Sequence, residues 1–289
     1  MTISILSGIS CHLGEGPSYD PLSDTLHWFD ILEKRLHGVQ LGSGRTSLTI
    51  LPVMGSAIFA IDGDRQLILT ERGFYSRYRR TGVTSLVIPV EDDNPATRSN
   101  DARAHRCGAV WFGTMGKHAE TGAGAIYHLL KGKVTKLYPA ISIPNAICFS
   151  PDGASAYFTD TAVNKLMRVA IDPSTALPTG DPQVLFDQSG KPGGIDGAIV
   201  DTDGVIWNAR WGIGQLVAIS PDGQLLREID LPAKQITCPA FVGPDFNRLA
   251  VTSASEGYTE ADRAADPDCG KTFLIDLPVF GRAEPNVLF

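Results

Sequence analysis

The chain has 289 residues, of which 43% are hydrophobic and 20% are charged, and its formal net charge at pH 7 is −7. This composition is ordinary for a globular protein with a sizeable core, and the acidic balance argues against nucleic acid or an anionic membrane as a main partner. No apolar run reaches the length of about 18 residues that a membrane-spanning helix needs.

The N-terminal residues MTISILSGIS lack the basic region and the long apolar region of a signal peptide. The five cysteines are odd in number, widely spaced and without a CxxC pair. Such usage indicates free thiols rather than a disulfide framework or a zinc site. We therefore expect a cytoplasmic protein.

A unit of about 40 to 50 residues recurs along the chain, which is the period of repeat architectures. Each copy has a turn rich in Asp and Gly, a short β-branched or aromatic run, a second turn and a second such run. In chain order the copies contain DPLSDTLHWFD, DGDRQLILTE, DARAHRCGAVWFG, PDGASAYFTDT, DTDGVIWNARW and GPDFNRLAVTS.

Short apolar segments precede each copy and follow most of them, so each unit has four predicted strands. Antiparallel four-stranded units at this period are typical of a β-propeller. The sequence therefore predicts an all-β fold with six blades, in one domain that covers residues 1–289. A pair of β-sandwiches or a β-helix is the alternative. The terminal segments TISIL and NVLF could share the last blade and close the ring, and residues 91–94 and 256–268 are expected to be long loops.

The first strand of each blade should line the central channel, and its first residues should face one mouth. Asn145 lies seven residues before the turn residue Asp152, and Asp196 lies seven before Asp203. The corresponding positions in the six units are Glu15, Gly55, Asn100, Asn145, Asp196 and Cys238. Four of these positions carry oxygen donors that should converge on one axis.

Two carboxylates and one or two amide oxygens around a small space suit a hard divalent cation. Such residues also cap turns or bond to channel water, which is the other interpretation. The six histidines show no ligand spacing, so a transition-metal cage is not predicted.

Five motifs in order resemble the senescence marker protein (regucalcin)/gluconolactonase family of six-bladed propellers along essentially the whole chain. They are LGEGPSYD, RSNDARAHRCGAVWFGTMG, IPNAICFSPDGASAYFTDT, GIDGAIVDTDGVIWNARWG and CPAFVGPDFNRLAVTSA. Tyr19 stands where a Trp is usual in the first of them. The resemblance implies lactonase activity on sugar lactones with calcium or another divalent ion.

By this resemblance, Glu15, Asn145 and Asp196 would be the direct metal ligands. Asn100 would lie beside the metal and hold substrate or water, and Arg98 would hold oxygen atoms of the substrate.

One departure concerns the segment GTMGKHAETGAG, where some family members carry an acidic residue that contacts substrate. Here Lys117 and His118 occupy that region, and Glu120 follows later. A cationic residue at this place could favour an anionic sugar derivative. The alternative is that Lys117 and His118 are solvated lid residues.

The resemblance and the predicted site together suggest hydrolysis of an aldonolactone to its aldonic acid. The ion would polarise the lactone carbonyl, and Asp196 would act as general base, with a water activated directly by the ion as its rival. Arg98 and Asn100 would fix the lactone ring for attack.

Three other interpretations stay open: a calcium-binding or regulatory propeller without turnover, a related metal-dependent esterase, and a protein-interaction propeller. The Arg98–Asn100–Asp101 segment favours the enzyme, because metal binding alone needs no arginine for substrate. We expect a small-molecule partner, and a monomer or a weak homo-oligomer.

Overall fold

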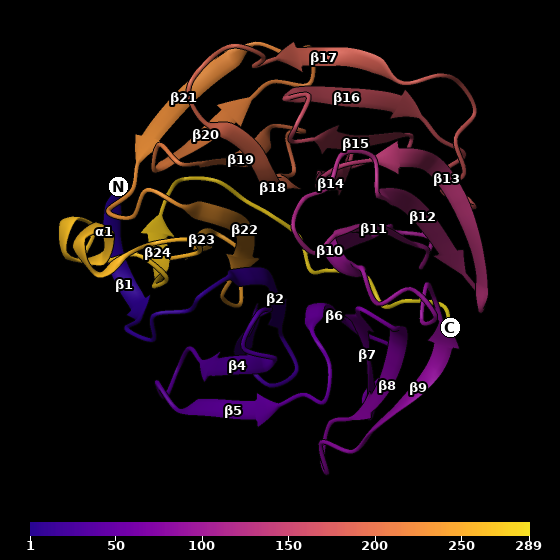
Figure 1. Cartoon of the computed structure of the whole chain (residues 1–289), viewed down its shortest axis with the longest axis horizontal. Coiled ribbons are helices and arrows are strands. Elements are labelled where there is room, and N and C mark those ends of the chain that lie inside the picture. The colour runs from indigo at the N-terminus through magenta and orange to yellow at the C-terminus, as the bar shows by residue number, and fades with distance from the viewer.

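The structure is a computed structural model that describes residues 1–289, and it is a ring of six four-stranded antiparallel sheets around a central channel (Figure 1). The predicted six-bladed propeller is therefore confirmed. In five blades the strands follow the chain from the channel outward, whereas the last blade has the order β22, β23, β24, β1 from the inside. The N-terminal strand thus closes the ring by completing the C-terminal blade.

The first three blades comprise β2 Gly14–Asp20, β3 Thr25–Asp30, β4 Arg35–Gln40 and β5 Thr46–Ile50; β6 Gly55–Ala60, β7 Arg65–Thr70, β8 Gly73–Tyr78 and β9 Thr84–Pro89; and β10 Thr97–Ala104, β11 Val110–Gly116, β12 Gly124–Leu130 and β13 Lys133–Ile141. The last three comprise β14 Pro144–Phe149, β15 Ser155–Asp160, β16 Lys165–Ala170 and β17 Gln183–Asp187; β18 Gly194–Val200, β19 Ile206–Trp211, β20 Gln215–Ile219 and β21 Leu225–Asp230; and β22 Ile236–Val242, β23 Arg248–Ser253, β24 Thr272–Asp276 and β1 Thr2–Ser7.

Burial falls from the inner strand of a blade to its outer strand. Every residue of β10, β14 and β22 is buried, whereas most residues of the outer strands β5 and β21 are exposed. The core is consequently a series of apolar clusters between neighbouring blades. Trp111, for example, packs between the third and fourth blades and donates its indole N–H to the Ala176 carbonyl at 2.9 Å.

The prediction of a loop over residues 256–268 is wrong in part, because it contains the short helix α1 (Glu260–Ala265). A capping box starts this helix: the Thr259 hydroxyl accepts the Asp262 amide, and the Asp262 carboxylate accepts the Thr259 amide. No helix in the structure could cross a membrane.

The C-terminal segment NVLF does not join the last blade, so that prediction is wrong, whereas TISIL does form its outer strand β1. Residues 277–289 instead cross the channel, as the yellow chain in Figure 1 shows. The tail is fixed there by backbone hydrogen bonds that link Phe280 to Thr202 and Leu288 to Gly108. With β1 in place the last blade already has four strands, so the final residues pack elsewhere, and Val287 lies buried between the second and third blades.

Candidate metal centre and active site

The inner strands break register with their neighbours close to one mouth of the channel. The pairing shifts between Glu15 and Ser18 in β2, between Asn145 and Cys148 in β14, and between Ile195 and Ala198 in β18. Such bulges redirect side chains and are common beside active sites. Glu15 and Asn145 are the last paired residues before their bulges, whereas Asp196 lies inside one, so the predicted equivalence of these positions holds to within one residue.

Left-handed backbone follows two of these positions. Gly16 has φ of 55°, and a Cβ on it would lie 1.9 Å from the Ser56 carbonyl oxygen, so only glycine fits there. Ala146 has φ of 53°, a conformation that L-residues other than glycine adopt at a cost of roughly 1–2 kcal/mol. The fold therefore holds left-handed backbone directly beside Glu15 and Asn145, which is unstrained at Gly16 and strained at Ala146.

A cavity of about 500 Å³ opens at this mouth, and all seven predicted site residues line it. They are Glu15, Arg98, Asn100, Lys117, His118, Asn145 and Asp196. Sequence reasoning missed Leu13, Met115, Ala119, Ile143, Thr161, Trp211 and Glu256 as lining residues. Trp211 and Glu256 lie at the end of β19 and in the loop after β23, where no repeat position marks them.

A chain of side-chain hydrogen bonds orients the amides. Arg98 donates from Nη1 to Asn100 Oδ1 at 2.8 Å, and Asn100 donates from Nδ2 to Asn145 Oδ1 at 2.9 Å. Asn145 in turn donates from Nδ2 to Thr161 Oγ1 at 2.9 Å. The bond to Thr161 thereby fixes the Asn145 amide with its oxygen toward Asn100. The second lone pair of Asn145 Oδ1 is then available for a ligand bond.

Glu15 and Asp196 are buried carboxylates with few partners. Each accepts one backbone N–H, from Gly16 and Gly197 respectively, at 3.0 Å. Neither takes part in any of the eight ion pairs of the chain. Burial, followed by the nearby Asp101 charge, raises the pKa of Glu15 to about 8. Burial and the Glu15 charge raise the pKa of Asp196 well above its ordinary value.

These residues fit a hard divalent cation. Glu15 and Asp196 are buried carboxylates that repel each other, and they line the cavity together with Asn145. The charges of Arg98 and Arg103 offset only part of the shift at Glu15, so a bound cation would stabilise the ionised carboxylates. No group of three or more His, Cys, Asp or Glu side chains that could hold a metal ion is found in the chain. The predicted donors are instead two carboxylates and one amide oxygen, which are ligands that hard divalent cations prefer.

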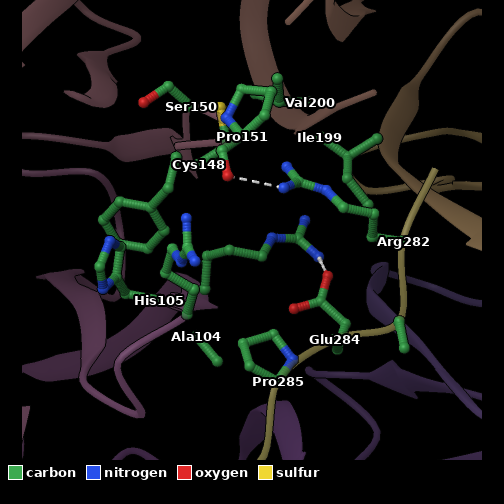
Figure 2. Close-up of a pocket in the computed structure, with 14 residues that line it drawn as sticks. Ala104, His105, Cys148, Ser150, Pro151, Ile199, Val200, Arg282, Glu284 and Pro285 are labelled. Carbon is green, nitrogen blue, oxygen red and sulfur yellow. Dashed lines mark hydrogen bonds and ion pairs between the residues drawn. The ribbon is translucent and has the colours of Figure 1, made fainter. Parts of the chain in front are cut away.

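Arg103 braces the channel between this cavity and the opposite mouth. It donates to the Ala198 carbonyl at 3.0 Å and pairs with Glu284 of the C-terminal tail at 2.8 Å. Figure 2 shows Glu284 and Arg282 of the tail pointing toward the ends of the inner strands. Asp101, two residues before Arg103, accepts the Ile147 amide at 2.7 Å and so ties the third blade to the bulge after Asn145.

The family described as the SMP-30/Gluconolactonase/LRE-like region matches residues 13–255. The chain belongs to this family. The resemblance seen in the five sequence motifs is therefore confirmed, and the family members named below include several lactonases, in agreement with the predicted class of enzyme.

The chain is 54% identical over 280 residues to a Rhizobium meliloti protein that carries the name sugar lactone lactonase, with 97% of this chain and 95% of that protein covered. It is 34% identical to the L-arabinolactonase of Azospirillum brasilense, over 94% of this chain and 90% of that one. A crystal structure described as the calcium-binding protein regucalcin, from Agrobacterium tumefaciens, is 50% identical with a TM-score of 0.97, over 99% of this chain and 96% of that one.

Proposed function

We propose that this protein is a divalent-metal-dependent lactonase that hydrolyses an aldonolactone to its aldonic acid. The observation that carries the proposal is the convergence of Glu15, Asn145 and Asp196 on one cavity that also contains Arg98 and Asn100. The relatives support the substrate class, because several of them are named as lactonases of sugar lactones.

Glu15, Asn145 and Asp196 would hold the ion. Calcium is the first choice because all three donors are oxygen atoms and because the similar regucalcin is described as calcium-binding; zinc, manganese and magnesium are alternatives. When bound, the ion would supply Lewis-acid polarisation of the lactone carbonyl.

The chain's own groups would position the substrate and move the proton. Arg98 lines the cavity, and a guanidinium has five N–H donors, so donors other than the one that bonds to Asn100 are left for a substrate oxygen. Asp196 would take a proton from the attacking water as the oxygen of that water bonds to the carbonyl carbon. The ring C–O bond then breaks, and the same proton can pass to the departing ring oxygen, which leaves the free acid.

The first test is proton release on a panel of neutral aldonolactones. Chelated protein would be assayed alone and after restoration with calcium, zinc, manganese or magnesium. We expect hydrolysis only after a metal is restored, and the panel then identifies the sugar. Full activity in the chelated protein would contradict the metal requirement, and metal binding without turnover of any lactone would contradict the lactonase proposal.

Metal binding without turnover of any lactone would favour a calcium-binding propeller that is not an enzyme. The description of the similar regucalcin as calcium-binding supports this alternative. A metal-dependent esterase for apolar substrates is the less favoured alternative, because Lys117, His118 and Glu256 make the rim of the cavity polar. Such a rim suits a hydroxylated substrate. The subunit number and the cytoplasmic location remain predictions.

The stability of the metal-free protein should depend on pH in an unusual direction. The folded-state pKa of Glu15 lies near 8, above its ordinary value of 4.5, so the folded chain binds this proton more tightly than the unfolded chain does. The Glu15 contribution to the free energy of unfolding should therefore fall as the pH rises from about 4.5 to 8. Burial lowers the pKa values of His27, His37, His105 and His128, and these histidines oppose the fall below about pH 6.5, so the Glu15 effect is measured above that pH. Added calcium should remove this loss, since it binds the ionised carboxylates. Urea unfolding at pH 6.5 and 8, with and without calcium, measures both effects; a stability of the chelated protein that rises from pH 6.5 to 8 would contradict the prediction.

A further inference from the structure

Lys117 stands at the rim of the cavity, but its charge is already compensated. Its ammonium lies 2.6 Å from Glu71 Oε2, and the two side chains are 27% and 11% exposed. Glu71 belongs to the turn between β7 and β8 of the neighbouring blade, and its other oxygen accepts the Met54 amide at 3.0 Å. Glu71 does not line the cavity itself. It is therefore a fixed, largely buried counter-charge that holds Lys117 from behind.

A second carboxylate, that of Glu256, faces the cavity without an ion-pair partner, although its charge acts on the Arg98 guanidinium in the same cavity. Glu256 lines the cavity and takes part in no ion pair, while its backbone carbonyl accepts the Gln235 side-chain amide at 3.0 Å. The loop thus fixes the backbone of Glu256 and leaves the carboxylate available to the cavity. An acceptor of this kind suits hydroxyl groups of a sugar and repels an anionic substituent.

We infer that the cavity selects neutral polyhydroxylated lactones and rejects rings that carry a carboxylate, phosphate or sulfonate. Glu71 is the specificity-determining residue, because it neutralises the rim cation that could otherwise bind an anionic substituent. This inference rests on the proposed lactonase function and extends it to the charge of the substrate. It also replaces the expectation that Lys117 favours an anionic sugar.

Members of the family differ in the charge of the lactones that their names denote. One relative, 30% identical over 277 residues, is the 6-deoxy-6-sulfogluconolactonase of Pseudomonas putida, whose name denotes an anionic lactone. Neutral and anionic rings are thus both substrates named within the family. A switch between them needs a charged group near the cavity, and the Lys117–Glu71 pair is such a group.

The test is steady-state hydrolysis by the metal-loaded full chain of gluconolactone and of the same ring with a 6-phosphate or a 6-sulfonate. Wild-type protein should favour the neutral lactone. Glu71→Gln frees the Lys117 ammonium, so we expect kcat/KM for both anionic lactones to rise by about tenfold or more, mainly through KM. For gluconolactone, the same variant should change kcat/KM by less than about threefold.

Two controls make the result specific. Asp62→Asn removes the same charge from an exposed ion pair with Arg65, in the turn between β6 and β7 of the same blade, and should leave the preference unchanged. Lys117→Met in the Glu71→Gln background should abolish the gain. Glu256→Gln is an independent test of the inference. It removes the carboxylate that repels an anionic substituent, so it should also raise turnover of the anionic lactones.

The possible failures can be told apart. If wild-type protein hydrolyses neutral and anionic lactones equally well, or if Asp62→Asn matches Glu71→Gln, the inference is overturned while the lactonase function stands. If wild-type protein with metal hydrolyses none of the lactones, the proposed function fails, and the inference with it.

Discussion

Asp196→Asn is expected to lower kcat/KM for lactone hydrolysis by roughly a thousandfold, the range that loss of a general base commonly gives. Asparagine has nearly the same shape and can still accept the Gly197 amide that Asp196 accepts at 3.0 Å. The variant removes only the charge, which is needed to take a proton and to hold the ion. Proton release on the lactone that wild-type protein prefers measures the loss, and calcium titration measures the weakened metal binding.

The same substitution should stabilise the metal-free protein, which separates a functional defect from damaged folding. Asp196 is a buried carboxylate whose pKa is raised by burial and by Glu15, so its neutral replacement removes a repulsion from the folded state. Asp203→Asn, in the exposed turn of the same blade, is the charge-matched control and should behave as wild type. A chelated Asp196→Asn protein that is less stable than chelated wild type, or one that keeps full activity, would contradict this assignment.

The largest effect on stability is expected from Arg103→Met, at about 3 kcal/mol of unfolding free energy. The substitution leaves Glu284 without its cation and the buried Ala198 carbonyl without the hydrogen bond that Arg103 supplies at 3.0 Å. Urea unfolding at fixed calcium concentration measures the change.

Arg106→Ala is the matched control, because Arg106 is exposed and its hydrogen bond reaches only the Asp152 carbonyl, also near the opposite mouth. It should cost less than about 1 kcal/mol. A double variant, Arg103→Met with Glu284→Gln, should lose less than the sum of the two single variants, since the residues interact directly. Equal losses for the Arg103 and Arg106 variants would show that Arg103 is not a brace.

The repeat made the ring predictable, because every blade must bury its faces against its neighbours and so reuses one strand pattern. Glu15, Asn100, Asn145 and Asp196 were predicted from the same repeat, since equivalent inner-strand positions should converge on the axis, whereas Arg98 was predicted only from the family resemblance. Thr161, Trp211 and Glu256 were not predictable in this way. They reach the cavity from a turn, a strand end and a loop, whose course depends on local packing rather than on the period.

The position of the C-terminal segment NVLF could not be predicted from the sequence for a different reason. Its apolar residues suit an edge strand as well as a packed tail, and only the assembled ring decides between them. Once β1 pairs with β24, the last blade is complete, and Val287 finds its apolar partners between the second and third blades. Similarly, the family resemblance predicts Lys117 near the substrate, but the sequence cannot reveal that Glu71, from another blade, forms an ion pair with it.

The C-terminal tail, which crosses the opposite mouth, also limits which end of the channel a ligand can use. Arg103 and Glu284 form an ion pair and line the pocket at that mouth, which shares no lining residue with the cavity, so we expect ligands to enter the cavity from its own mouth only. The acid product must then leave the cavity by the opening through which the next lactone enters. Product and substrate consequently use the same opening and the same cavity. Accumulated product should therefore inhibit the enzyme competitively, without a second regulatory site.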